Sequence, residues 1–487
     1  MRPTVNFLNK ELIEKILSEA REILCRLGVT IHNAEVLSLL ADHGGAVDKA
    51  KKHVLFNNDM IDKALAAAPK SFKLYDALGN EAADMSGYNV NYVPGSAAIY
   101  FLDHEAPISR QAVTADYVKY TKIIGQMKYI ALQSTAMVPS DVHENISDSY
   151  RLYLSLVNCA KPVVTGAFRI ESFDIMKDLQ MAVRGSEEAL KNKPLTIFSC
   201  CPSSPLKWSD VTSQNLLDCA RFSIPVEYIA MPLAGFIAPV TLVGTLIQHT
   251  AETLSGLVIS QLANPGTPVL YGGSPAIFDI RYETTPMGAV ETQMIDCAYN
   301  EIGKYLGLPT QAYIGLSDAK HLDPQAGLES SMGTTLAALA GINSVSGPGM
   351  LDFENCFSLE KLVADNEICG MALRMINGIE PHEDFPALPR FEELLREQHL
   401  LISDHTMKYL KKEHYFPGPL IERATRARWQ EEGGRTFSHR AGEEVKKILQ
   451  NHIPSPLPDE TKKELTKLME TEAGRSGMDM LPWIADL

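Results

Sequence analysis

Several features that would assign this chain to a common class are missing from its sequence. It has no Cys-x-x-Cys pair, no Gly-x-Gly-x-x-Gly after a strand-like run, and no Gly-x-Ser-x-Gly. It has no uninterrupted apolar run of about 18 residues, so no membrane span is expected. The first fifteen residues lack the apolar core of a signal peptide. These absences argue against a disulfide framework, a dinucleotide-binding fold, a serine hydrolase and a membrane protein.

Excess positive charge is also missing. The chain of 487 residues carries 45 basic and 60 acidic residues, a formal net charge of −15. Phosphate backbones require clustered lysine and arginine, so nucleic acid is not expected as a partner. Eight cysteines are scattered along the chain, a pattern typical of reduced thiols in the cytoplasm and not of a disulfide framework.

A repeating strand–helix rhythm occupies the middle of the chain. Helical periodicity fills the intervals between strand-like runs, for example Ile146–Cys159, Phe173–Arg184, Thr241–Leu262 and Thr292–Leu306. The expected strands are Ala98–Leu102, Ile130–Ala136, Pro162–Ala167, Thr196–Cys200, Pro225–Met231, Pro268–Tyr271, Thr310–Ile314 and Ser344–Gly347. Eight such units predict an α/β protein with a TIM (β/α)8 barrel, and an open doubly wound sheet is the alternative.

The segments on either side of this rhythm differ from it. Residues 1–95 combine helical stretches with short strands and predict an α+β cap, which leaves residues 96–357 for the barrel. Residues 358–487 show polar helices and a Pro-rich break, which predicts a helical extension packed on the barrel.

Polar residues and glycines gather where the expected strands end, above all between Tyr313 and Met350. In a barrel these ends meet at one mouth, which is where active sites form. Aromatic rings there could form a cation–π cage, acids could add negative potential, and Arg281 could pair with a substrate carboxylate. The substrate-binding candidates are Tyr100, Tyr271, Arg281, Tyr313, Asp318, Phe353 and Glu354.

Two other chemistries have weak support. Adjacent Cys200 and Cys201 seldom chelate one ion, and no third ligand accompanies them, so no metal site is expected. Core packing or mouth lining is the better interpretation of both thiols. The serines of Gly315-Leu-Ser and Gly272-Gly-Ser lack the elbow of a nucleophilic serine.

Several blocks together resemble the trimethylamine methyltransferase family, and in particular its members without pyrrolysine that demethylate betaine-type amines. The blocks are Ile23–Val29, Ala67–Tyr75, Arg110–Asp116, Gly315–Glu329, Ser358–Glu367 and Arg440–Leu449. They span nearly the whole chain. The chain holds only standard residues, whereas trimethylamine enzymes of the family place pyrrolysine in the barrel, near the Gly347–Asn355 loop in this numbering.

The resemblance implies a TIM barrel that passes a methyl group from a quaternary amine to Co(I) of a separate corrinoid protein. Glycine betaine, proline betaine and carnitine are the substrates it favours. Because Co(I) is then the nucleophile and the corrinoid comes with the partner, no catalytic side chain and no tightly bound cofactor is expected. A homo-oligomer is expected as well. Two alternatives are a quaternary-amine binding protein without turnover and a metal-dependent barrel lyase or hydrolase.

Overall fold

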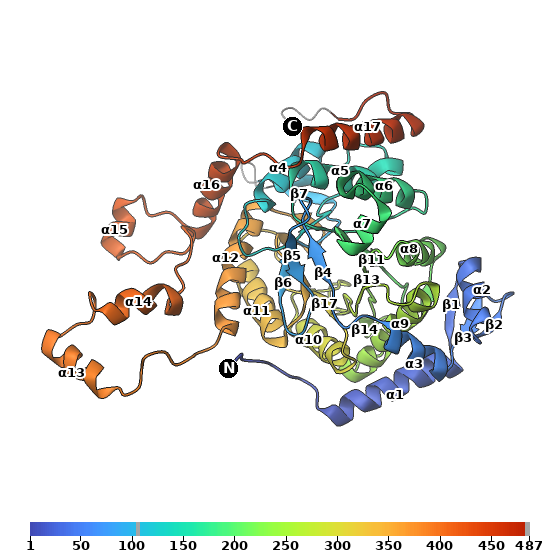
Figure 1. The fold of residues 1–487 in the computed structure, drawn as a ribbon, viewed down its shortest axis with the longest axis horizontal. Helices are drawn as coiled ribbons and strands as arrows, with labels where there is room; N and C mark the ends of the chain where they lie inside the picture. The colour runs from blue at the N-terminus through green and yellow to red at the C-terminus, as the bar shows by residue number, and fades with distance from the viewer. Residues whose placement is uncertain (104–107, 483–487) are drawn as a thin grey trace.

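The computed structural model describes residues 1–103 and 108–482 and shows an α/β protein (Figure 1). Eight short parallel strands alternate with helices. The strands are β6 (Asn91–Val93), β9 (Gln133–Ser134), β10 (Val163–Thr165), β11 (Thr196–Cys200), β13 (Val226–Tyr228), β15 (Val269–Leu270), β17 (Gln311–Tyr313) and β18 (Ser344–Ser346). The helices that follow them are α4 (Thr114–Ile124), α5 (Ser147–Asn158), α6 (Ser172–Arg184), α8 (Asp210–Arg221), α9 (Leu242–Ala263), α10 (Val290–Tyr305), α11 (Pro324–Ala340) and α12 (Leu359–Ile376).

The strands form two parallel sheets, in the orders β15-β13-β11-β10-β9 and β17-β18-β6. A single parallel bridge between Tyr271 and Thr310 joins the sheets on one side. On the other side the carbonyl of Tyr92 accepts hydrogen bonds from the N–H groups of Ala131 and Leu132, at 3.0 and 3.3 Å. The strand order is therefore that of a ring, although the hydrogen-bonded ladder is not continuous around it.

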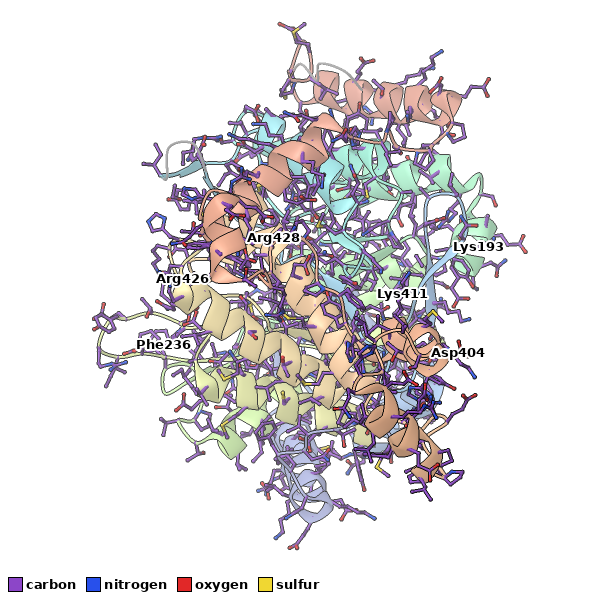
Figure 2. All side chains as sticks on the ribbon, turned by 90° about the vertical axis from the view of Figure 1, so that its left-hand side faces the viewer. Lys193, Phe236, Asp404, Lys411, Arg426 and Arg428 are labelled. Carbon is purple, nitrogen blue, oxygen red and sulfur yellow. The ribbon has the colours of Figure 1, made fainter. Side chains whose placement is uncertain are left out.

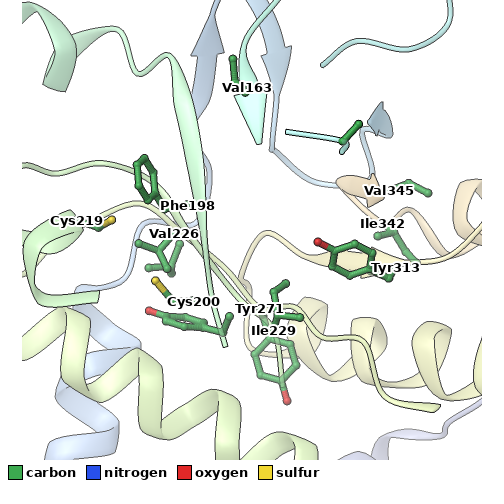
Figure 3. Close-up of a cluster of buried hydrophobic side chains, with 14 of the residues drawn as sticks. Val163, Phe198, Cys200, Cys219, Val226, Ile229, Tyr271, Tyr313, Ile342 and Val345 are labelled. Atoms are coloured by element: carbon green, nitrogen blue, oxygen red, sulfur yellow. The ribbon is translucent and has the colours of Figure 1, made fainter. Parts of the chain in front are cut away.

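The interior of the ring is layered. Val93, Val164, Ile197 and Leu270 make an apolar floor together with side chains of the hairpin β4 (Lys73–Tyr75) and β5 (Glu81–Asp84). Side chains alternate along a strand, so the next inward position on β11 is Ser199, two residues after Ile197. A second core lies between the strands and the helices (Figure 3). Figure 3 shows Val163, Phe198, Val226 and Val345 among its side chains.

One expected strand was wrong. Ala98–Leu102 was predicted to open the barrel, but the first barrel strand is β6, which pairs with β18. Strand β7 (Tyr100–Leu102) instead joins β8 (Ser109–Gln111), β19 (Met350–Leu351) and β20 (Cys356–Phe357) in a separate sheet. The signal was misleading because β6 and β7 each have three residues and two strand-forming side chains, so composition does not distinguish the barrel strand from β7.

The N-terminal elements lie against the outside of the barrel. They are α1 (Lys10–Arg26), β1 (Val29–Ile31), α2 (Ala34–Asp42), β2 (Ala46–Asp48), β3 (His53–Leu55) and α3 (Asn58–Ala67). All three helices contact α9, and β1 pairs with β12 (Lys207–Trp208). The remaining elements before the C-terminal part are η1 (Glu144–Ile146), α7 (Glu187–Asn192), β14 (Leu233–Ala234) and β16 (Ala276–Ile277). The division at residues 95 and 357 stays a prediction.

The C-terminal part contains α13 (Leu388–Glu397), α14 (Asp404–Glu413), α15 (Arg426–Glu431), α16 (Phe437–Gln450) and α17 (Asp459–Arg475). Helix α16 packs on α12 and α4, and α17 packs on α5 and α6. By contrast α13 to α15 project from the barrel (Figure 1), and α13 and α15 have no buried residue.

Candidate active site

The candidate site lies inside the ring, above the apolar floor. Glu227, on β13, is fully buried, and its Oε1 accepts a hydrogen bond from the Ser199 hydroxyl at 2.7 Å. Its Oε2 is buried and has no hydrogen-bond partner. Glu227 is the inward-facing residue between Val226 and Tyr228, so strand alternation places its carboxyl in the barrel interior. Burial raises the pKa of this carboxyl to about 7.

A second carboxyl, that of Glu354, reaches the same region from the loop after β18. It accepts a hydrogen bond from the backbone N–H of Ser96 at 3.3 Å. The Ser96 hydroxyl in turn lies 2.9 Å from the Tyr313 hydroxyl at the end of β17. Removal from water raises the pKa of Glu354 to about 8, and the charge of Glu227 adds to the rise. Ser96, Glu227, Tyr313 and Glu354 are called the barrel site below.

The loop that carries Glu354 has an unusual backbone. Asp352, Phe353 and Glu354 have φ values of 53°, 56° and 71° in succession, and none of the three is glycine. The left-handed conformation costs an L-residue about 1–2 kcal/mol. Non-glycine residues held in it concentrate at functional sites. Contacts on both sides hold the loop, because Asp352 donates its N–H to Ala319 O at 3.0 Å while Glu354 accepts from Ser96.

A second hollow, of about 660 Å³, lies outside the barrel site and shares this loop with it. Its lining residues are Ile277, Asp279, Arg281, Tyr282, Thr284, Pro286, Ala289, Glu291, Asp318, Ala319, Lys320, His321, Asp323, Gln325, Glu329 and Phe353. It is called the outer hollow below. Phe353 faces the outer hollow, whereas the next residue, Glu354, reaches the barrel site.

The outer hollow contains two cations that already have partners. Lys320 Nζ lies 2.9 Å from an Asp352 oxygen and 3.8 Å from the centre of the Phe353 ring. Arg281 is largely exposed and forms a two-point pair with Asp279, at 2.5 and 2.9 Å. The ring face of Phe353 that could receive a substrate cation is thus in contact with a lysine of the chain itself.

The carboxylate of Asp318 holds two loops together. Its two carboxylate oxygens accept the N–H groups of Met287 and Gly288, both at 2.9 Å, and so connect the loops after β15 and β17. Burial raises its pKa to about 6. Asp318 is also one of the residues that line the outer hollow.

The seven predicted binding residues therefore fall into separate places. Tyr313 and Glu354 belong to the barrel site, and Arg281, Asp318 and Phe353 line the outer hollow. Two residues lie elsewhere. Tyr100 is partly exposed on β7, and the buried Tyr271 donates its hydroxyl to Thr250 on α9 at 3.0 Å.

Sequence reasoning missed two members of the barrel site, Glu227 and Ser96. A signal for Glu227 was available, since a lone acid inside the otherwise apolar run Pro225–Met231 must face away from its apolar neighbours. Ser96 has no comparable signal, because its place depends on the long-range contacts of the loop after β6.

Eight strand–helix units with polar side chains collected at the carboxyl ends of the strands are the arrangement of α/β-barrel enzymes. A solved structure, the monomethylamine methyltransferase of Methanosarcina barkeri, has the same fold with a TM-score of 0.51. The match covers 96% of this chain and 88% of that one, at 13% identity.

The family model for trimethylamine methyltransferase (MTTB) matches residues 1–475, so the chain belongs to the trimethylamine methyltransferase family and is a methyltransferase. A trimethylamine methyltransferase of Methanosarcina thermophila is 30% identical over 468 residues, which cover 95% of this chain and 96% of that protein. The glycine betaine methyltransferase of Desulfitobacterium hafniense is 29% identical over 462 residues, with 94% and 95% covered. The trimethylamine methyltransferase of D. hafniense is 28% identical, with 97% and 95% covered.

Proposed function

We propose that the protein demethylates a betaine-type quaternary amine, of the glycine betaine, proline betaine or carnitine class, and passes the methyl group to a corrinoid carried by a separate protein. The observation that carries the proposal is the pair of carboxyls in the barrel site, Glu227 and Glu354, one of which has an unpartnered oxygen. A quaternary ammonium has no N–H and is bound by charge and by ring faces, not by hydrogen bonds.

The barrel site can perform this task by position and charge alone. Glu227 and Glu354, once ionised, attract the cation, and the Tyr313 hydroxyl contacts Ser96, whose N–H donates to Glu354. A quaternary nitrogen leaves as a neutral amine, so no side chain has to protonate it. A reduced corrinoid would supply the nucleophile. The protein then has to orient one methyl group toward the mouth and exclude water.

Exposed apolar side chains on the loops around the mouth support docking of a partner. Phe236, Val240, Ile280 and Tyr282 are 64–77% exposed and follow β13 and β15. Phe236, at the tip of a projecting loop in Figure 2, stacks on Phe278 with ring centres 4.7 Å apart. Exposed apolar patches rimmed by polar residues are typical of protein interaction sites. We assign this rim to the corrinoid protein.

The test is a methyl-transfer assay with a reduced corrinoid protein and a panel of glycine betaine, proline betaine, carnitine and trimethylamine. Loss of the Co(I) absorbance should require enzyme, corrinoid protein and one of the betaines together. Tight betaine binding by calorimetry without this change would instead favour a binding protein. No absorbance change with any amine of the panel would refute the proposed reaction.

We also propose that the chain self-associates through residues 379–416, called the arm below. Its large apolar side chains are Ile379, Phe385, Leu388, Phe391, Leu395, Leu401, Ile402, Met407, Leu410 and Phe416, exposed by 38–91%. They offer on the order of 1,000 Å² of apolar surface, against roughly 800 Å² that each partner buries in a standard interface. Several charges of the arm are paired within it, as in Lys408–Glu383 and Arg390–Glu393, which leaves an apolar surface for a second copy of the chain.

A cytoplasmic location is part of the same proposal. All eight cysteines are free thiols, which fits a reducing compartment. No helix within the described residues is both long enough and apolar enough to span a bilayer.

A further inference from the structure

Glu354 stands in the turn of a short hairpin. Strands β19 and β20 pair in antiparallel fashion, and the four residues between them, 352–355, form the turn that carries Glu354 to the barrel site. Three of these residues, 352–354, have positive φ values. Non-glycine residues keep such a backbone only where the surrounding structure imposes it. The hairpin therefore requires firm contacts at its tip and at its base.

The tip of the hairpin fits against the loop after β6. Glu354 accepts the N–H of Ser96 and also lies against Gly95. A Cβ atom on Gly95 would lie 3.0 Å from Glu354 Oε1 and would clash with Met350 Cγ. The N–H of Gly95 donates to Pro348 O at 3.3 Å. The close approach of Gly95 thus gives the carboxyl of Glu354 a fitted seat.

The base of the hairpin is held by a buried ion pair of α12. The N–H of Gly349 donates to Asp365 Oδ2 at 2.7 Å, and its carbonyl accepts the N–H of Ser358, the N-cap residue of α12, at 3.0 Å. Lys361 Nζ lies 2.8 and 2.6 Å from the two oxygens of Asp365 and donates to Ser330 Oγ on α11 at 2.6 Å. Lys361 and Asp365 are each 1% exposed. The start of the hairpin is therefore tied to two helices of the barrel wall.

The ion pair is better suited to fixing a position than to adding stability. The desolvation of two buried charges can cost more than their attraction returns, and apolar replacements for such pairs often leave a protein equally stable. The hydrogen bond from Gly349 is the contact by which Asp365 reaches beyond the ion pair itself. An ionised acceptor holds a backbone N–H more strongly than a neutral one does. The charge of Asp365 therefore strengthens the contact that fixes the hairpin.

We propose that Asp365 is a positioning residue for Glu354: the Lys361–Asp365 pair holds the N–H of Gly349, and the hairpin fixed in this way delivers the carboxyl of Glu354 to the barrel site. Asp365 acts through the hairpin and not by contact with the substrate. A hairpin released at its base would let the carboxyl of Glu354 leave its seat and meet water. The inference rests on the proposed function for what Glu354 binds, but not for how Glu354 is held.

The placement of Glu354 can be measured without a substrate. A protonated carboxyl gives an infrared C=O band that disappears on ionisation, and the band of Glu354 is the one that Glu354→Gln removes. Burial raises the pKa of Glu354 to about 8, so hydration of a displaced carboxyl should lower the midpoint of this band by about one pH unit. The titratable groups that interact with Glu354 are Glu227, Tyr313 and Cys201. Glu227→Gln identifies the band of Glu227, which titrates in the same range.

Two double variants separate the hydrogen bond from the ion pair. The leucine pair, Lys361→Met with Asp365→Leu, removes both. The asparagine pair, Lys361→Met with Asp365→Asn, removes the charges but keeps an oxygen for the N–H of Gly349. Neither leaves the uncompensated buried charge that a single substitution would create. The leucine pair should shift the Glu354 band and raise the Kd for glycine betaine about tenfold. The asparagine pair should keep the midpoint of the band close to that of the wild type.

The matched control is a second buried ion pair, Arg151–Asp148, in which both side chains are 1% exposed. Its carboxylate also accepts a backbone N–H, that of Phe168, at 2.7 Å. Arg151→Met with Asp148→Leu should therefore cause a similar loss of contacts at a different loop. The Glu354 band should not move in this control.

If the leucine pair does not fold, Gly349→Ala displaces the same base of the hairpin, because its Cβ would lie 2.6 Å from the ring of Phe357. An unmoved Glu354 band in a folded leucine pair or in Gly349→Ala would overturn the proposal. A shift in the asparagine pair as large as that in the leucine pair would overturn it too. A shifted band in the leucine pair, together with no binding of glycine betaine by the wild-type chain, would support the positioning role and count against the proposed substrate alone.

Discussion

The Tyr313 hydroxyl lies 2.9 Å from the hydroxyl of Ser96, and this contact joins the end of β17 to the loop after β6. Ser96 also donates its N–H to Glu354. The loop after β6, the strand β17 and the loop after β18 therefore meet at one point, close enough to Glu227 for its charge to raise the pKa of both Tyr313 and Glu354.

Betaine binding should become tighter as the pH rises through the pKa values of about 7 and about 8 of Glu227 and Glu354. A quaternary ammonium does not titrate, so the change reports the protein carboxyls. Each ionisation adds a negative charge beside the cation. Isothermal titration calorimetry with glycine betaine, at a series of pH values on either side of this window, measures the effect.

Glu227→Gln and Glu354→Gln should each weaken this binding by about 2 kcal/mol at high pH and flatten its pH dependence. Glu252→Gln removes a buried carboxylate outside the barrel site and is the control. It should keep the wild-type affinity for betaine and the wild-type pH dependence of binding. An unchanged pH profile in the two barrel-site variants would rule out carboxylate binding of the cation.

The free energy of unfolding should decrease as the pH rises, whereas betaine binding should become tighter. Burial raises the pKa of Glu227 from 4.5 to about 7, so between these values the folded chain binds more protons than the unfolded chain. The free energy of unfolding therefore falls as pH rises through this window, by on the order of 3 kcal/mol for Glu227 alone. Urea unfolding at a series of pH values should show this fall, and a smaller one in Glu227→Gln. An equally steep fall of the free energy of unfolding with pH in Glu227→Gln would show that Glu227 is not its source.

Phe353 allows strain and ring contact to be measured separately. Phe353→Ala and Phe353→Gly both remove the ring, but only glycine accepts the φ of 56° without cost. The glycine variant should be more stable than the alanine variant by about 1 kcal/mol. Both should weaken betaine binding equally, by about 0.5–2 kcal/mol, if the ring contacts the substrate. Equal stability of the two variants would show that the loop relaxes when the ring is lost.

The sequence predicted the fold better than the site, for a physical reason. The helix α10 and the strand β17 were recognisable because periodicity and strand alternation are local patterns. The site depends on which loops meet across the ring. Tyr271 was a plausible cage residue at a strand end, yet its ring packs beside His249 on α9, with ring centres 5.6 Å apart. Strand alternation turns Tyr271 outward, and that parity cannot be fixed from the sequence without the register of the ring.

The variant Tyr271→Phe tests whether Tyr271 lies outside the substrate site. The substitution removes only the hydroxyl that donates to Thr250, inside the layer between strands and helices. The free energy of unfolding should fall by about 1 kcal/mol, because the buried Thr250 oxygen loses a donor. The KM for a betaine should not change, since the ring does not belong to the barrel site. A raised KM at unchanged stability would return Tyr271 to the substrate cage.

Arg281→Ala tests whether the outer hollow receives a substrate carboxylate. Arg281 is exposed and paired with Asp279, so the loss of stability should be small. If Arg281 contacts the carboxylate, KM should rise for glycine betaine and stay unchanged for choline, which has the same cation without the acid. Equal effects on both would remove the carboxylate role.

Leu395→Glu tests the arm. Leu395 is 72% exposed on α13, a helix of ten residues with no buried side chain. A helix this short is marginal in water and requires tertiary packing. If a second copy covers its apolar face, the charge should dissociate the assembly in light scattering coupled to size exclusion. Leu328→Glu on α11, where Leu328 is equally exposed at 72%, is the matched control and should leave the assembly intact. A wild-type chain that remains monomeric at all concentrations would refute the self-association.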